Sequence, residues 1–253
     1  MLISEKLKTV KITQGAGDIM AALPYIKALG GEHIHLVINH PNVPTWHPIN
    51  HGGANALIPL LESQGFKASI VEHCNLYYHV FDIDMDARVD YGWDGSRGDI
   101  YTWNSLFYGV YPDMTKQFIH IEDVEQGNYI ALTQTARYLN PVIDYRFLND
   151  IDMEKRFIGT EGEWTFVHQL YPGITGLTYH PTEDFYEAAK ILKASKVYIS
   201  NQTSLAVLAE GLAIPRVMVV CPQFPSAVMK TPNGRPVITQ RFFENSIVEL
   251  LNL

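Results

Sequence analysis

The first forty residues of the chain alternate between strand-like and helix-like hydrophobic patterns. Residues 8–13 are rich in β-branched side chains, which favours a strand. Residues 19–29 carry apolar side chains at helical spacing and stop before a glycine pair, and Pro24 predicts that this helix starts late or is kinked. Residues 33–38 predict a second strand. Strand, glycine turn, helix and strand in this order form a βαβ unit, which builds a parallel sheet.

The remainder of the first half is less regular. Residues 40–53 are rich in Pro, Asn, Gly and His and predict a long loop, after which residues 54–64 have a helical pattern. Residues 68–71 and 76–83 are typical of strands. The segment 90–112 is crowded with Trp, Tyr, Gly and Asp and has poor periodicity. We interpret it as a binding surface rather than a core element.

The pattern restarts after a polar segment, 121–128, which we interpret as an interdomain link. A second array of strands and helices follows, so the sequence predicts an α/β chain of two halves. We place the first domain at 1–122, the second at 128–240 and a final helix at 241–253. The predicted strands of the second half are 129–133, 156–159, 197–200 and 216–220, and its predicted helices are 161–170, 184–193, 203–212 and 242–251.

Composition and charge restrict the class of protein. Hydrophobic residues make up 47% of the chain and charged residues 18%, so a sizeable core is expected. The net charge of -8 argues against broad binding to nucleic acid or to an anionic membrane, both of which need Lys and Arg. Two distant cysteines argue against a disulfide framework and a structural zinc site. No apolar run approaches 18 residues and no signal peptide is visible, so we expect a cytoplasmic chain with at most peripheral membrane contact.

The strongest candidate chemistry lies in residues 199–216. A buried strand ends there in small polar residues that precede a helix of small apolar ones. The helix start offers unpaired backbone N–H groups and a partial positive charge, and Thr203 and Ser204 add hydroxyls, so a diphosphate could bind without a metal. Glu210, about two turns on, could accept hydrogen bonds from ribose hydroxyls. The alternative is that these residues only cap the helix.

A glycine turn after the first strand is the second candidate. Gly15 and Gly17 permit close backbone approach, and Asp18 follows them at the carboxyl end of the strand, where open α/β sheets bind ligands. The G-x-G-x-x-G dinucleotide pattern fails because Met20 occupies its third glycine position. A carboxylate there repels phosphate and suits a general base, unless Asp18 simply caps the helix.

Two further segments could contact a substrate. Arg137, followed by Tyr138, comes just after the first strand of the second half, and arginine can bind a phosphate with two hydrogen bonds; the alternative is a solvated side chain. The aromatic segment could stack on sugar faces in an acceptor pocket or belong to the core. Its candidate acceptor residues are Trp93, Asp94, Arg97 and Trp103.

Metal binding is not predicted. An EF-hand loop starting at Asp82 would need Gly and Glu where the chain has Ala87 and Trp93. The alternating carboxylates of Asp82, Asp84 and Asp86 could instead hold a metal-bound nucleotide or, as we prefer, lie on the wet face of a strand. The ten histidines include no helical metal-binding pair with an adjacent Glu.

Two motifs resemble one enzyme family. Residues 17–24, GDIMAALP, are similar to the G-D-x-x-x-x-x-P opening of the ADP-heptose:lipopolysaccharide heptosyltransferases of glycosyltransferase family 9, and residues 188–222 are similar to that family's second-domain segment. The resemblance covers about a fifth of the chain. It implies the GT-B fold, in which two Rossmann-like domains face each other across a cleft. The first domain would bind the acceptor and the second the nucleotide-sugar donor.

The resemblance also assigns roles to individual residues. Asp18 matches the family's proposed catalytic base, and Asn201, Gln202, Thr203 and Ser204 match its donor-phosphate loop. The chain departs from the family where Gln-Thr-Ser replaces the usual Asp-Ser/Thr-Gly, and where residues 206–208 lack the usual His. The donor base, the sugar and the acceptor therefore stay open.

The resulting hypothesis is metal-independent transfer of a sugar from a nucleotide-sugar to an acceptor hydroxyl, with Asp18 as general base and no separate cofactor. Three alternatives remain: a nucleotide-sugar epimerase or hydrolase, a non-catalytic nucleotide-sugar-binding module, and a phage-type DNA-base glucosyltransferase. The acidic balance of the chain speaks against the last, because it would need a basic DNA-binding face.

Overall fold

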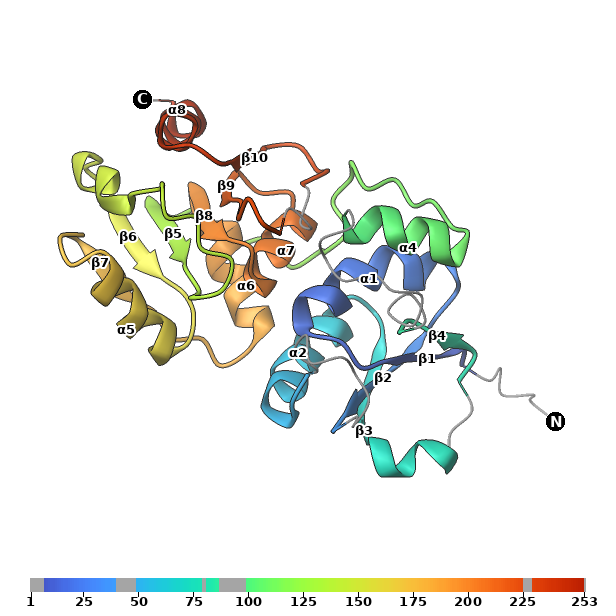
Figure 1. Ribbon diagram of the computed structural model, residues 1–253. Helices are drawn as coiled ribbons and strands as arrows, with labels where there is room; N and C mark the ends of the chain where they lie inside the picture. The colour runs from blue at the N-terminus through green and yellow to red at the C-terminus, as the bar shows by residue number, and fades with distance from the viewer. Residues whose placement is uncertain (1–6, 40–48, 79–80, 87–98, 225–228, 253) are drawn as a thin grey trace.

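Two parallel β-sheets form the framework of the molecule. The computed structural model describes residues 7–39, 49–78, 81–86, 99–224 and 229–252 (Figure 1). The first sheet has the order β3-β2-β1-β4 and the second the order β10-β9-β8-β5-β6-β7. The strands are β1 (Thr9–Ile12), β2 (His33–Ile38), β3 (Lys67–Glu72), β4 (Ile83–Asp84), β5 (Tyr129–Thr133), β6 (Glu154–Phe157), β7 (Leu177–Tyr179), β8 (Val197–Asn201), β9 (Arg216–Val219) and β10 (Gly234–Val237).

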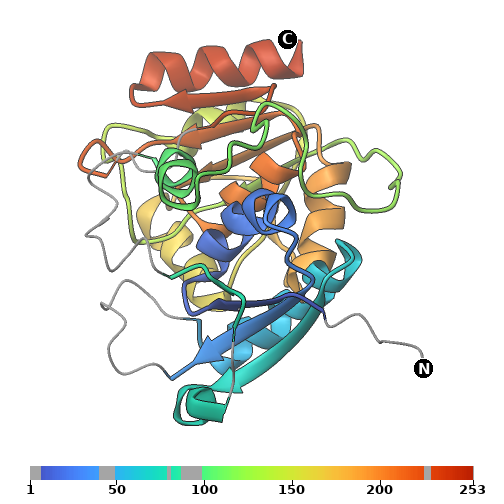
Figure 2. The ribbon, with the colours of Figure 1, turned by 90° about the vertical axis from the view of Figure 1, so that its right-hand side faces the viewer.

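Helices connect the strands in both halves, so the predicted α/β architecture is confirmed. Helix α8 packs on the second sheet through buried Phe243 and Ile247, and Figure 2 shows it at the opposite end of the molecule from the first sheet. The helices are α1 (Ala16–Ala28), α2 (His51–Ser63), α4 (Ile100–Tyr108), α5 (Glu161–Leu170), α6 (Phe185–Ala194), α7 (Ser204–Gly211) and α8 (Gln240–Leu251), with 3₁₀ turns η1 (His73–Tyr78) and η2 (Tyr145–Asp150).

The strand order reverses once in each sheet. In the first, the chain builds β2 and β3 on one side of β1 and then places β4 on its other side. In the second, β6 and β7 lie on one side of β5, and β8, β9 and β10 on the other. The loops that leave two neighbouring parallel strands diverge at such a reversal, and the gap between them is where open α/β sheets bind ligands. In this molecule such gaps lie at the carboxyl ends of β1 and β4 and at those of β5 and β8.

The two halves share one apolar core. Helices α1 and α2 of the first half pack against α7 and α6 of the second, and Figure 1 shows all four between the sheets. Buried side chains from both halves, among them Ile26, Leu61, Leu192 and Leu208, form one continuous cluster. Because this interface is apolar and continuous, it fixes the ligand-binding edges of the two sheets relative to each other.

The segment 90–112 is only partly the irregular surface that we predicted. Residues 100–108 form helix α4, in which the side chain of Asp99 accepts a hydrogen bond from Thr102 N and Gly109 ends the helix at a φ of 64°. Its buried face consists of Ile100, Tyr101 and Asn104, and the buried polar Asn conceals the hydrophobic period. The sequence prediction was wrong here because a buried amide counts as a surface residue in any periodicity analysis.

Two other local predictions were also wrong. The stretch 76–83 is not one strand, since η1 ends at Tyr78 and the two-residue β4 begins only at Ile83. Helix α2 begins at His51, inside the predicted loop, because the Asn50 side chain caps it by accepting a hydrogen bond from Gly53 N. Helix α1 begins at Ala16 and continues through Pro24, so the helix does not start late. In the described part of the chain, every helix is too short or too polar to cross a membrane.

Gly211, the last residue of α7, lies where the two halves pack closely. A Cβ atom on Gly211 would lie 2.5 Å from Ile119 Cδ1 and 2.9 Å from Phe118 Cε2. We expect Gly211→Ala to lower the free energy of unfolding by about 1–3 kcal/mol through overpacking. In Gly162→Ala the nearest atom is Thr160 Oγ1 at 4.0 Å. That exposed helical position should gain up to about 1 kcal/mol. Urea denaturation of both variants checks the prediction, and equal effects would contradict it.

Candidate functional site at the junction of the two halves

The carboxyl end of β8 is organised by two buried amide side chains. Asn201 Nδ2 donates to the carbonyl oxygens of Thr135 (3.1 Å) and Arg137 (2.6 Å), and its Oδ1 accepts from Thr135 N (3.0 Å). Gln202 Oε1 accepts from Cys221 N at 2.7 Å, and Gln202 Nε2 donates to the Phe224 carbonyl. The loops that follow β5, β8 and β9 are therefore held together at the strand-order reversal of the second sheet.

Helix α7 starts directly from this anchored point. Thr203 is its N-cap, and the Thr203 hydroxyl oxygen accepts a hydrogen bond from Ala206 N at 3.1 Å. Ser204 is the first helical residue, and both Thr203 and Ser204 are partly exposed. The predicted cap is thus present. The positive end of the helix dipole lies at the junction of the halves, where it favours an anion.

The loop after β5 brings a cation to the same edge. Arg137 is exposed, while its carbonyl is bound by Asn201 as described above. Tyr138 adopts a φ of 54°, and its ring lies 5.7 Å from that of Phe224 and 5.9 Å from the Arg137 guanidinium. The backbone of this loop is fixed and the guanidinium is accessible to solvent, an arrangement suited to binding a phosphate.

The glycine turn of the first half is fixed by β4. Asp86 Oδ1 accepts from Thr13 N at 2.8 Å, and Gln14 Nε2 donates to the Met85 carbonyl at 3.2 Å. Asp86 is buried, and burial raises the pKa of its carboxyl group. Asp86 was not among the predicted site residues. Its position shortly after the predicted strand 76–83 was the sequence feature that could have indicated it. These contacts set where the chain enters α1.

The carboxylates of Asp82, Asp84 and Asp86 bind the neighbouring strand β1. Asp82 accepts from Thr9 N at 2.7 Å, and Lys11 Nζ lies 2.9 Å from Asp84 and 3.5 Å from Asp86. The expected wet strand face is therefore correct for exposed Asp84 but wrong for buried Asp86. Among the described residues, no group of three or more His, Cys, Asp and Glu side chains could hold a metal ion.

Asp18 lies in the first turn of α1 and is partly exposed. The N-cap of this helix is Gly15, which makes no side-chain cap. Asp18 is thus not at the N-cap position itself, and it lies in the first turn, where the helix dipole stabilises a negative charge. The helix that carries Asp18 packs against α7 at the junction of the two halves.

The two turns are in direct contact. A Cβ atom on Gly17 would lie 3.3 Å from Ser204 Cα, which is closer than most Cβ contacts in proteins. It would lie 3.7 Å from Val207 Cγ2, an ordinary van der Waals distance. The first turn of α1, which contains Asp18, therefore lies against the start of α7. The contact also leaves no room for a diphosphate between Gly17 and Ser204.

The structure places Glu210 away from any ribose. Its side chain is buried and forms an ion pair with Arg216, and its Oε1 accepts from Lys230 N (2.6 Å) and Thr231 N (2.7 Å). Protein groups bind both carboxylate oxygens, so the predicted ribose contact is wrong. Glu210 does not belong to the candidate donor site.

Of the four predicted acceptor residues, one lies in the described part of the chain. Trp93, Asp94 and Arg97 lie outside the described residues. Trp103 is in α4 and is partly buried. Of the neighbouring aromatic residues, Tyr101 is buried and Tyr111 is exposed, so the segment contributes both to the core and to the surface.

Comparison with known proteins identifies the architecture. No family model matches the chain, and no curated protein matches its sequence. Solved structures do match. ADP-heptose lipopolysaccharide heptosyltransferase II of E. coli has a TM-score of 0.60 at 12% identity, with 98% of this chain and 99% of the other covered. A glycosyl transferase family 9 protein of Veillonella parvula has a TM-score of 0.55 at 11% identity, with 100% and 90% covered.

A third match is the dodecameric iron-containing heptosyltransferase TibC in complex with ADP-D-beta-D-heptose, with a TM-score of 0.52 at 13% identity, covering 90% of this chain and 63% of TibC. The chain has the GT-B fold. The resemblance stated from residues 17–24 and 188–222 is thereby confirmed for the fold. In this GT-B chain the two motifs contain the two helix starts, of α1 and α7, that meet at Gly17 and Ser204.

Proposed function

We propose that this GT-B chain is a glycosyltransferase that moves a sugar from a nucleotide-sugar donor to an acceptor hydroxyl. The observation that carries the proposal is the contact between Gly17 and Ser204. It places the first turn of α1, which contains Asp18, beside the start of α7. The fold shared with the heptosyltransferases adds support.

Asp18 would act as the general base. Its carboxylate accepts the proton of the acceptor hydroxyl while the hydroxyl oxygen forms a bond to the anomeric carbon of the donor sugar. The bond between that carbon and the diphosphate oxygen breaks in the same step, and the nucleoside diphosphate leaves with the electron pair. Asp18 is partly exposed, in the first turn of α1.

The departing diphosphate would be stabilised by protein groups in place of a divalent metal. The start of α7 supplies backbone N–H groups and the positive end of a helix dipole, Thr203 and Ser204 supply hydroxyls, and Arg137 supplies a full positive charge. Asn201 and Gln202 would serve this site by fixing the loops, since their amide groups bind main-chain atoms. Gly15 and Gly17 would permit the close approach of α1.

A thermal-shift screen of ADP, GDP and UDP and their sugars tests the donor assignment. A ligand present at about 100 times its dissociation constant should stabilise the native state by about 2.7 kcal/mol. We expect one nucleotide class to raise the melting temperature of the wild type and to raise it less in Arg137→Ala. No shift with any nucleotide would contradict the proposal. Product analysis with donor alone then separates transfer from hydrolysis or epimerisation, which need no acceptor.

A further inference from the structure

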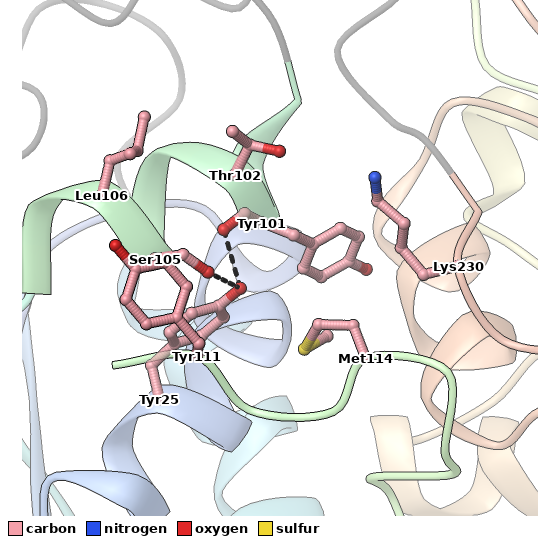
Figure 3. Close-up of a pocket in the computed structure, with 8 residues that line it drawn as sticks. All are labelled: Tyr25, Tyr101, Thr102, Ser105, Leu106, Tyr111, Met114 and Lys230. Atoms are coloured by element: carbon pink, nitrogen blue, oxygen red, sulfur yellow. Dashed lines mark hydrogen bonds between the residues drawn. The ribbon is translucent and has the colours of Figure 1, made fainter. Parts of the chain in front are cut away.

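A cavity lies on the boundary between the halves, apart from the candidate functional site. It has a volume of about 320 Å³, at the small end of the range for ligand pockets. Figure 3 shows it between side chains of α1, α4 and the segment after α4 on one side and a lysine of the second half on the other. The lining residues are Tyr25, Tyr101, Thr102, Ser105, Leu106, Tyr111, Met114 and Lys230.

The first half provides a fixed, largely apolar wall. Tyr25 Oη donates to the Tyr101 carbonyl at 2.7 Å and lies 3.2 Å from Ser105 Oγ, which ties α1 to α4 beneath the cavity (Figure 3). Burial raises the pKa values of Tyr25 and Tyr101, so both phenols are neutral. Leu106 and Tyr111 are 66% and 73% exposed and form an apolar rim. These two exposed side chains offer contact area for an apolar group of a ligand in the cavity.

The second half provides the charge. Among the described residues that line the cavity, Lys230 alone is charged. Its backbone N–H donates to the buried Glu210 carboxylate at 2.6 Å, which fixes the position of the lysine. The Lys230 ammonium has a long 3.6 Å contact with Asp99, whose carboxylate also binds Thr102 N and Thr102 Oγ1 at the start of α4. The ammonium therefore keeps capacity for an anionic ligand.

We propose that this cavity binds a small amphipathic anion, with an aromatic or short acyl body against Tyr111, Leu106 and Met114 and a single carboxylate or phosphate on Lys230. The apolar wall and the single cation complement the two ends of such a ligand. Because the ligand would contact both halves, its binding would favour their present arrangement.

The cavity is separate from the proposed transfer site. Tyr25 and Asp18 lie seven residues apart on α1, which corresponds to about 10 Å along the helix. The proposal does not depend on glycosyl transfer, because the binding groups are a different set. Asp18→Asn should accordingly bind the same ligand as well as the wild type does.

Phenyl phosphate is the test probe, with inorganic phosphate and phenol as its two separated parts. We expect saturable binding of phenyl phosphate by calorimetry or ligand-observed NMR, with each part alone binding at least about tenfold more weakly. Lys230→Met should weaken phenyl phosphate on the order of tenfold by removing a charge-assisted hydrogen bond. Tyr111→Ala should weaken it about threefold or more through lost ring contact.

Matched variants distinguish the cavity from the general surface. Lys116→Met removes an exposed lysine of a nearby segment, and Phe242→Ala removes an exposed ring of α8; neither residue lines the cavity. Both should bind phenyl phosphate as the wild type does. Both Lys230 and Tyr111 are partly or largely exposed, so the folds of their variants should persist. No saturable binding, or equal affinity in the wild type and Lys230→Met, would overturn the proposal.

Discussion

Replacing Asp18 with Asn should lower turnover by about 10²–10⁴-fold while leaving nucleotide affinity nearly unchanged. Asn has nearly the same size and can still accept a hydrogen bond, but it cannot take a proton from the acceptor hydroxyl at neutral pH. The nucleotide contacts proposed here come from the α7 start and Arg137, on the other half of the molecule. The measurement is kcat for glycosyl transfer, with nucleotide affinity from calorimetry on the same samples.

Glu161→Gln is the matched control. Glu161 is also an acidic residue in the first turn of a helix, α5, and it is exposed. Its neutralisation removes the same helix-dipole interaction, about 0.3–1 kcal/mol, without touching the junction. Turnover should persist. Asp18→Asn should lower kcat with little change in nucleotide affinity, a split that a purely structural role for Asp18 would not produce. Loss of nucleotide affinity together with turnover, or loss of neither, would contradict the assignment.

The second large effect concerns stability. Arg216→Met should lower the free energy of unfolding by about 3–5 kcal/mol, because it leaves the buried Glu210 without its counter-charge. Arg216 is fully buried, and its Nη1 also donates to the carbonyls of Ile214 (2.8 Å) and Pro232 (3.1 Å). Burial lowers the pKa of Arg216 and Glu210 opposes that shift. Denaturant unfolding followed by circular dichroism measures the loss.

A second substitution should recover part of that loss. In the double variant Arg216→Met with Glu210→Gln, both charges of this buried pair are absent, and the amide oxygen can still accept from Lys230 N and Thr231 N. The double variant should therefore be more stable than Arg216→Met alone. Arg235 and Glu249 provide an exposed comparison pair at 3.0 Å, and Arg235→Met should cost less than about 1 kcal/mol. A double variant less stable than the single one would contradict the argument.

Patterns of hydrophobic and polar residues predicted most of the secondary structure in the second half. Strands β5, β8 and β9 and helices α5, α6 and α7 lie within one or two residues of their predicted bounds. The strands are fully buried, largely apolar runs, and the helices begin at the caps Thr160, Asp184 and Thr203. Strands β7 and β10 were missed. Their burial patterns show partly and fully exposed residues, so they lack the apolar runs of central strands.

The sequence by itself determined the two chemical turns. Small residues and an acid after β1, and a Thr-Ser helix start after β8, are local features that backbone capping and helix dipoles specify. Only the tertiary structure decided that Gly17 and Ser204 touch and that Glu210 is locked to Arg216. Both facts arise from contacts between elements, which no local pattern specifies. The packing of helices α1 and α7 brings Gly17 close to Ser204. The burial of Glu210 in α7 depends on Arg216, six residues away at the start of strand β9.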